Sequence, residues 1–217
     1  MPRTPEENDR IRKLSKDKIC AAAMELFIKQ GYYATSINDI AKQAGISKGL
    51  LYNYYKGKEE LLAEMVVART REVIKVIEEA SAIEIPSKQL EHIVEGAINN
   101  IQQKPDVYRF YLHLQTQPIA DEELIKYSRL LIEENARMFE VQCEIFERLG
   151  VKNPRQRSLY FSTVLQGSML MIATYPNKIP IAEIKKEIIA EFCKEPNVES
   201  VKPDQGGTEN GNKGESN

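Results

Sequence analysis

The residues best suited to chemistry in this sequence are the polar side chains between positions 35 and 58, in the segment TSINDIAKQAGISKGLLYNYYKGK. Hydroxyl, amide and ammonium groups on short helices are the groups with which proteins bind the phosphate oxygens and base edges of double-stranded DNA. We therefore predict that this segment is a helix-turn-helix. The residues that we expect to contact DNA are Thr35, Ser36, Ser47, Lys48, Gly49, Tyr52, Asn53, Tyr54 and Lys58.

Two serines are placed to begin the two short helices of this segment. Ser36 and Asp39 have the spacing of a capping box, and Ser47 precedes the second helix. Gly45 lies between the helices and suits the tight turn that a helix-turn-helix requires. The free backbone N–H groups at both helix starts add donors for phosphate oxygens.

The second short helix must dock on one side and contact DNA on the other. We expect Leu50 and Leu51 to dock it against the domain. Gly49 has no side chain and would allow the helix to come close to the DNA groove. The outward side then carries Lys48, Gly49, Tyr52 and Asn53.

The segment from Gly31 to Leu62, GYYATSINDIAKQAGISKGLLYNYYKGKEELL, resembles the TetR family of bacterial transcriptional regulators. Tyr54 and Tyr55 match family positions that carry a histidine or tyrosine and an aromatic residue. Asn53 stands where the family often has an aromatic residue, a departure that concerns base preference. The resemblance implies a helix-turn-helix, a long fourth helix leading to a ligand-binding body, and two last helices that pair with a second subunit.

Helical periodicity runs through the chain, and the sequence predicts an all-α fold. Proline and glycine residues mark the ends of the expected helices. We predict nine helices, over residues 15–30, 36–44, 48–54, 58–80, 87–103, 105–116, 121–149, 154–174 and 180–194.

The chain divides into three predicted parts. Residues 1–58 would form the DNA-binding domain with a flexible N-terminal arm, and residues 59–195 the helical ligand-binding and dimerisation domain. Residues 196–217 contain few apolar side chains, so we expect a disordered tail. Residues 1–60 carry 11 Lys and Arg against 8 Asp and Glu, whereas the whole chain has a net charge of -2. A mildly basic head is therefore attached to an acidic body.

Aromatic and methionine side chains are frequent in the body and are suited either to a packed core or to the wall of a cavity. The family resemblance implies such a cavity between the fifth and eighth helices, filled by a small apolar or amphipathic effector. The candidate lining residues are Tyr108, Tyr111, His113, Gln115, Tyr127, Phe139, Cys143, Phe146, Gln166 and Met169, with Asn135 as one further polar candidate. His113 could instead be an interior hydrogen-bonded residue, and Cys143 a buried structural cysteine or a thiol sensor.

Residues 158–177 include no charged side chain over 20 positions, which is the length of a membrane span. Seven polar residues in this stretch favour burial in protein over lipid. Such an apolar helix has more surface than one subunit covers, so we predict a homodimer built from the last two helices. The expected interface residues are Tyr160, Val164, Gly167, Ser168, Leu170, Met171, Ile184, Ile188 and Phe192.

The sequence shows no metal-binding spacing, phosphate-binding glycine loop or nucleophile elbow. We therefore expect no enzyme, no metal and no cofactor. Three widely separated cysteines and an N-terminus without an apolar run favour a reduced, cytoplasmic location without membrane partners. The leading hypothesis is a homodimeric repressor of a palindromic operator that a small molecule releases. The alternative is a DNA-binding interaction protein without an effector.

Overall fold

The computed structural model describes residues 4–116, 122–175 and 177–194. Within these ranges the chain forms nine helices and no strand, which confirms the predicted all-α fold. The helices are α1 (Pro5–Gln30), α2 (Ile37–Gln43), α3 (Lys48–Tyr52), α4 (Lys58–Ser81), α5 (Pro86–Gln103), α6 (Pro105–Thr116), α7 (Glu122–Arg148), α8 (Pro154–Thr174) and α9 (Ile181–Phe192).

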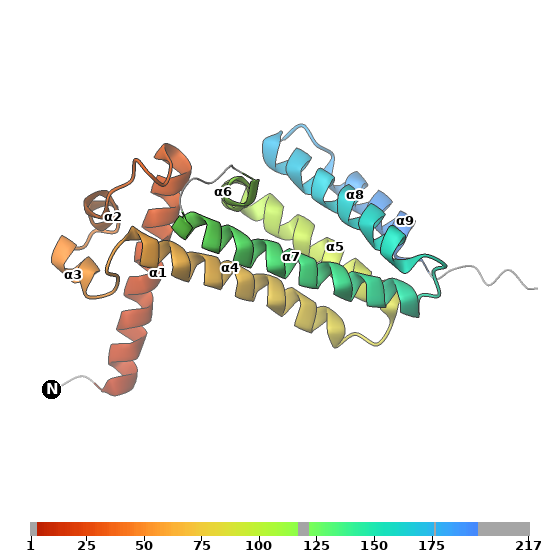
Figure 1. The fold of residues 1–217 in the computed structure, drawn as a ribbon, viewed down its shortest axis with the longest axis horizontal. Coiled ribbons are helices and arrows are strands. Elements are labelled where there is room, and N and C mark those ends of the chain that lie inside the picture. The colour runs from red at the N-terminus through yellow and green to blue at the C-terminus, as the bar shows by residue number, and fades with distance from the viewer. Residues whose placement is uncertain (1–3, 117–121, 176, 195–217) are drawn as a thin grey trace, which may run out of the picture.

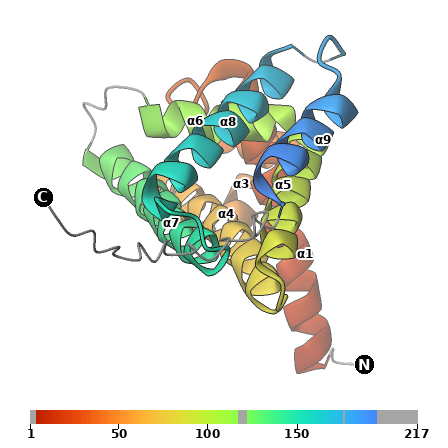
Figure 2. The ribbon, with the colours of Figure 1, turned by 90° about the vertical axis from the view of Figure 1, so that its right-hand side faces the viewer.

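The helices form a small head at one end and an elongated body (Figure 1). Helices α1 to α3 make up the head, and α4, α5 and α7 run lengthwise away from it. Helices α8 and α9 lie side by side along the body, as the end view in Figure 2 also shows. The short helix α6 contacts α1, α7 and α8, so it joins the head to the body.

The first helix begins well before Ser15, and the prediction of a flexible arm over residues 5–14 was wrong. The Thr4 hydroxyl caps the helix by accepting a hydrogen bond of 3.3 Å from the Glu7 backbone N–H. Pro5 occupies the first helical position, where its missing N–H costs nothing, and two glutamates lie in the first turn. These local signals start the helix although its first turns are exposed.

Two hydrophobic clusters hold the molecule together. The head cluster consists of buried side chains from α1, α2, α3 and the first turns of α4. It also includes Tyr111 and Leu114 of α6 and Tyr127 and Leu131 of α7. The body cluster contains side chains of α5, α7, α8 and α9, with Phe146 and Phe161 fully buried at its centre. The head is therefore completed by residues that are distant in sequence.

Two further expectations concern the C-terminal tail and the possibility of a membrane span. The predicted disordered tail, residues 196–217, lies outside the described residues. Over the ranges that the structure does describe, none of the helices has the length and apolarity needed to cross a membrane.

Candidate nucleic-acid interface and internal cavity

The start of α2 is fixed by a reciprocal capping box, as the sequence predicted. The Ser36 hydroxyl accepts a hydrogen bond of 3.1 Å from the Asp39 N–H, and the Asp39 carboxylate accepts one of 3.0 Å from the Ser36 N–H. Hydrogen bonds from the side chain and then the backbone of Ser36 lower the pKa of the Asp39 carboxyl. The negative charge at the helix start is thus retained well into acidic solution.

The turn between α2 and α3 depends on Gly45, whose φ of 68° lies in the left-handed region that glycine adopts without strain. The chain then enters α3 through Ser47, whose hydroxyl accepts a hydrogen bond of 3.1 Å from the Leu50 N–H. Ser36 and Ser47, which we expected to contact DNA, therefore also fix where α2 and α3 begin.

Helix α3 docks through one leucine and exposes the other. Leu51 is completely buried, whereas Leu50 is 39% exposed, so the prediction that both leucines dock was wrong. Adjacent side chains on a helix point about 100° apart, and Leu51 is the one that faces the domain. The exposed side carries Lys48, Gly49, Tyr52 and Asn53, as predicted.

The outward side of α3 is open and carries a cation. Apart from its chain neighbours and the backbone of its own helix, no described residue has an atom within 4 Å of the position that a Cβ would take on Gly49, so the backbone there can approach a partner closely. The Lys48 Nζ lies 5.9 Å from the centre of the Tyr52 ring, which is itself 48% exposed. A shallow hollow next to these two side chains is bordered by Thr35, Ser36 and Asn38 at the start of α2.

Tyr54 and Tyr55 anchor this region to α1. Tyr54 is half-buried, with the Arg12 guanidinium 5.6 Å from its ring centre. Tyr55 is 1% exposed and its hydroxyl lies 3.6 Å from the Cys20 sulfur. Burial raises the pKa of the Tyr55 hydroxyl, which stays protonated.

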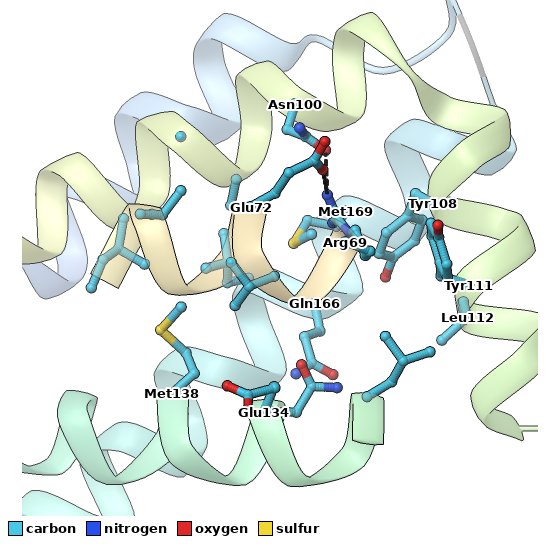
Figure 3. A pocket seen from close by; sticks show the side chains of 18 of the residues that line it. Arg69, Glu72, Asn100, Tyr108, Tyr111, Leu112, Glu134, Met138, Gln166 and Met169 are labelled. Atoms are coloured by element: carbon cyan, nitrogen blue, oxygen red, sulfur yellow. Dashed lines mark hydrogen bonds and ion pairs between the residues drawn. The ribbon is translucent and has the colours of Figure 1, made fainter. Parts of the chain in front are cut away.

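A cavity of about 210 Å3 lies in the body, with walls from α4 to α8. Arg69 of α4 forms an ion pair of 3.0 Å with Glu72 and donates a hydrogen bond of 3.3 Å to Asn100 of α5. Figure 3 shows these three side chains on one side of the cavity, with Glu134 of α7 and Gln166 of α8 across from them. The rings of Tyr108 and Tyr111 close one end.

The comparisons with known proteins agree with this geometry. Residues 19–65, which include the C-terminal part of α1, all of α2 and α3 and the first turns of α4, match the family model of bacterial regulatory proteins of the tetR family. The chain is a member of the TetR family. It is therefore a transcriptional regulator with a helix-turn-helix.

Some relatives of this TetR-family regulator match most of its length, and others match only a segment. The transcriptional regulator LmrA of Bacillus subtilis is 27% identical over 78% of this chain and 92% of its own. The regulator QacR of Staphylococcus aureus is 51% identical over a segment that covers 24% of this chain and 27% of its own. The structure of NalD of Pseudomonas aeruginosa, a repressor of a multidrug efflux pump, has a TM-score of 0.64 at 18% identity, covering 83% of this chain and 96% of that one.

Two residues that we expected to contact DNA have structural partners in this regulator. Thr35 is 1% exposed and donates a hydrogen bond of 2.8 Å to the Gly31 carbonyl. The Lys58 ammonium donates to the carbonyl oxygens of Tyr32, Tyr33 and Thr35 at 3.0, 3.2 and 3.2 Å. A lysine has three donors, so these bonds use all of them. The prediction of direct DNA contacts is corrected for both residues.

Half of the predicted cavity residues line the cavity of this TetR-family protein. They are Tyr108, Tyr111, Gln115, Gln166 and Met169, together with Asn135. The residues that do not line it are His113, Tyr127, Phe139, Cys143 and Phe146.

The five misplaced residues lie on other faces of α6 and α7 or at other levels of the body. His113 is exposed, and the Tyr127 hydroxyl donates a hydrogen bond of 3.4 Å to the Glu59 carbonyl at the head. The cavity stripe of α7 is Leu131, Glu134, Asn135, Met138 and Gln142. Phe139 instead lies beside Arg155 of α8, whose guanidinium carbon is 5.3 Å from its ring centre, and Cys143 is buried. Phe146 follows the stripe into the body cluster and packs on Phe161.

Several charged and amide residues of the wall were not predicted, namely Arg69, Glu72, Asn100, Glu134 and Gln142. Gln142 is 5% exposed and accepts hydrogen bonds from Ser158 and Ser162 of α8. The signal that could have revealed Arg69 and Glu72 is their spacing of three residues on the side of α4 that carries Val73 and Val76.

The predicted dimer surface is partly exposed and partly internal. Tyr160, Leu170 and Met171 of α8 are 51%, 44% and 46% exposed. Beyond the backbone of α8 itself, a Cβ on Gly167 would meet no atom of the described residues within 4 Å. Val164, Ser168 and Ile184 are half-buried. Ile188 and Phe192 are each 3% exposed in the body cluster, because α9 turns its apolar stripe toward α5 and α8. The prediction that these two residues face a partner is corrected.

Proposed function

We propose that this regulator is a cytoplasmic homodimer that represses transcription at a palindromic operator and leaves the DNA when a small apolar or amphipathic molecule occupies the cavity. The observation that carries the proposal is the course of α4. Its first turn begins beside the helix-turn-helix, and its residues from Arg69 to Val76 form one wall of the cavity. One rigid element therefore touches both the DNA-binding head and the ligand site.

The exposed side of α3 supports the DNA-binding part of the proposal. In helix-turn-helix proteins the second helix enters the major groove, and dimers place two such helices about 34 Å apart. Lys48 and Tyr52 offer an ammonium and a hydroxyl on the side away from Leu51, and Gly49 permits close approach. A dimer bound across two half-sites represses where its operator overlaps a promoter.

The outward stripe of α8 supports the dimer. Tyr160, Gly167, Leu170 and Met171 recur at helical spacing along one side, which leaves an apolar strip on the surface of one subunit. A second copy would cover this strip about a two-fold axis, with the glycine allowing the two helices to cross closely. The same axis would set the two α3 helices at a fixed separation.

Contacts of α6 support the coupling between ligand and DNA. Its Tyr111 lines the cavity and donates a hydrogen bond of 3.0 Å to the Met65 carbonyl of α4. Its neighbour Phe110 stacks on Phe27 of α1 with ring centres 6.0 Å apart. A ligand that displaces Tyr111 would thus move α4 and α1 together. By linkage, DNA must weaken the binding of that ligand by the same factor.

The alternative function, a DNA-binding interaction protein without an effector, would be favoured by a collapsed body with a large exposed patch. The cavity between α4 and α8 favours the effector reading instead. No group of three or more metal-ligating side chains occurs among the residues that the structure describes, and the relatives named above are regulators. We accordingly propose no catalytic activity.

The test of DNA recognition begins by selecting a duplex from a randomised library with the purified protein. Lys48→Ala and Tyr52→Ala should each weaken binding to that duplex, measured by fluorescence anisotropy, by about 5- to 100-fold, because a base contact contributes roughly 1–3 kcal/mol. Lys152→Ala, an exposed body residue, is the control and should bind like the wild type. Unchanged affinity and salt dependence in both α3 variants would contradict the assignment.

A further inference from the structure

The cavity wall contains a carboxylate with one unsatisfied oxygen. The Glu134 side chain is 13% exposed, and its Oε2 is buried with no hydrogen-bond partner among the described residues. Its other oxygen lies 3.4 Å from the Arg137 guanidinium, which is itself 64% exposed. A buried acceptor without a donor is costly, more so when it carries charge. Glu134 is one of the residues that line the cavity, so a donor that enters there is in a position to satisfy this oxygen.

The positive group of the wall is already neutralised. The Arg69 side chain is 17% exposed and holds Glu72 at 3.0 Å and Asn100 at 3.3 Å. Its guanidinium carbon also lies 5.9 Å from the centre of the Tyr111 ring. Glu72 balances the charge of this arginine, so an anionic ligand would compete with that carboxylate. Glu134, on the opposite side, has only the exposed Arg137 as a charged partner among the described residues (Figure 3).

The rest of the wall suits an apolar body of limited size. Tyr108, Met138 and Met169 line the cavity, whose volume of about 210 Å3 exceeds the roughly 150 Å3 known to admit a benzene ring. Tyrosine rings also attract cations through their faces. One aromatic ring with a short chain that ends in an amine combines the two requirements.

We propose that the effector is an organic cation, a protonated amine on an apolar body, whose N–H groups donate to the Oε2 of Glu134. This inference deepens the proposed function and rests on it for the claim that the cavity is an effector site. It excludes a carboxylate or phosphate headgroup as the feature recognised at this position.

The test compares three probes that differ only in their polar end: 4-phenylbutylamine, 4-phenylbutanol and 4-phenylbutyrate, with octylamine as a second amine. Binding to the full-length protein is measured by isothermal titration calorimetry near neutral pH. We expect an amine to bind at least about tenfold more tightly than the alcohol and the acid, because hydrogen bonds between charged groups are stronger than neutral ones.

The variant that decides the matter is Glu134→Gln, which keeps the shape of the side chain and removes its charge. It should weaken amine binding by about 10- to 100-fold and abolish the preference for the amine over the alcohol. Glu133→Gln, on the exposed neighbouring position of α7, is the matched control and should bind like the wild type. Thermal unfolding of both variants checks that each is folded.

Three results would overturn the inference: tighter or equal binding of the acid or alcohol, equal amine affinity in Glu134→Gln and wild type, or no binding of either amine at about 1 mM. Different results would contradict the proposed function rather than the ligand class. An amine that binds through Glu134 but leaves affinity for the selected duplex unchanged would contradict release by ligand and keep the ligand class. Release by the acid alone would keep the function and overturn the class.

Discussion

Lys58 stabilises the loop between α1 and α2 by donating to three backbone carbonyl oxygens at once. Its ammonium also lies 4.6 Å from the centre of the Tyr32 ring. The loop carries Thr35 and leads directly into the Ser36 cap of α2. A single side chain at the first position of α4 thereby fixes where the helix-turn-helix begins.

Lys58→Met should lower the free energy of unfolding by about 2 kcal/mol, because it leaves three carbonyl oxygens without their charged donor. Urea unfolding of the full-length protein measures this. Lys56→Met is the control, since the Lys56 side chain is exposed, and it should change stability by no more than about 0.5 kcal/mol. Equal stability of Lys58→Met and wild type, with a weaker salt dependence of DNA binding, would instead identify Lys58 as a phosphate contact.

At the scale of elements, α6 is the piece that links cavity and head. It places Tyr108 and Tyr111 on the cavity wall, and the two differ in the hydrogen bonding of their hydroxyls. The Tyr111 hydroxyl donates to the Met65 carbonyl, whereas no partner of the Tyr108 hydroxyl is found among the described residues. Burial raises the pKa of both hydroxyls, so both stay protonated.

This pair allows a matched comparison of two tyrosine-to-phenylalanine variants. Tyr111→Phe should destabilise the protein by about 1 kcal/mol, the net contribution of one buried hydrogen bond. Tyr108→Phe removes a hydroxyl without a partner and should leave stability within about 0.5 kcal/mol of the wild type. Chemical unfolding monitored by circular dichroism gives both values. Similar losses in the two variants would show that the bond to Met65 does not stabilise α6.

Local signals were enough to predict most helices and the exposed side of α3. The Ser36–Asp39 cap, the turn at Gly45 and the prolines that open α5 and α8 act within a few residues, so they can be read from the sequence. The cavity wall depends on how each helix is rotated about its axis, which distant contacts determine. Phe139 and Cys143 were misplaced for this reason, and Glu134 was missed because a glutamate on a helix is usually exposed.

At the scale of the whole molecule, the apolar stripe of α8 is the surface through which we propose that two copies of the chain associate. Gly167→Arg and Leu170→Glu each place a charge in the proposed interface, and burying an unpaired charge there is prohibitive. We expect both variants to sediment as monomers and to lose most of their affinity for the selected duplex, because a dimer binds paired half-sites.

Ile132→Glu on α7 is the control for this prediction, since Ile132 is 51% exposed on another side of the body. It should remain a dimer and bind DNA like the wild type. A wild-type protein that sediments as a monomer and still binds the duplex would place the interface elsewhere or remove the need for one.

The head cluster bears on how such regulators are recombined, in the laboratory or by natural exchange of gene segments. Its buried members extend past residue 58 through Val66 of α4, and Tyr111 and Leu131 close it from the body. A head transplanted from a relative as residues 1–58 would arrive without the side chains that complete its core. A working chimera would therefore carry the new head through the first turns of α4 and would match the surface of α6 to the incoming α1.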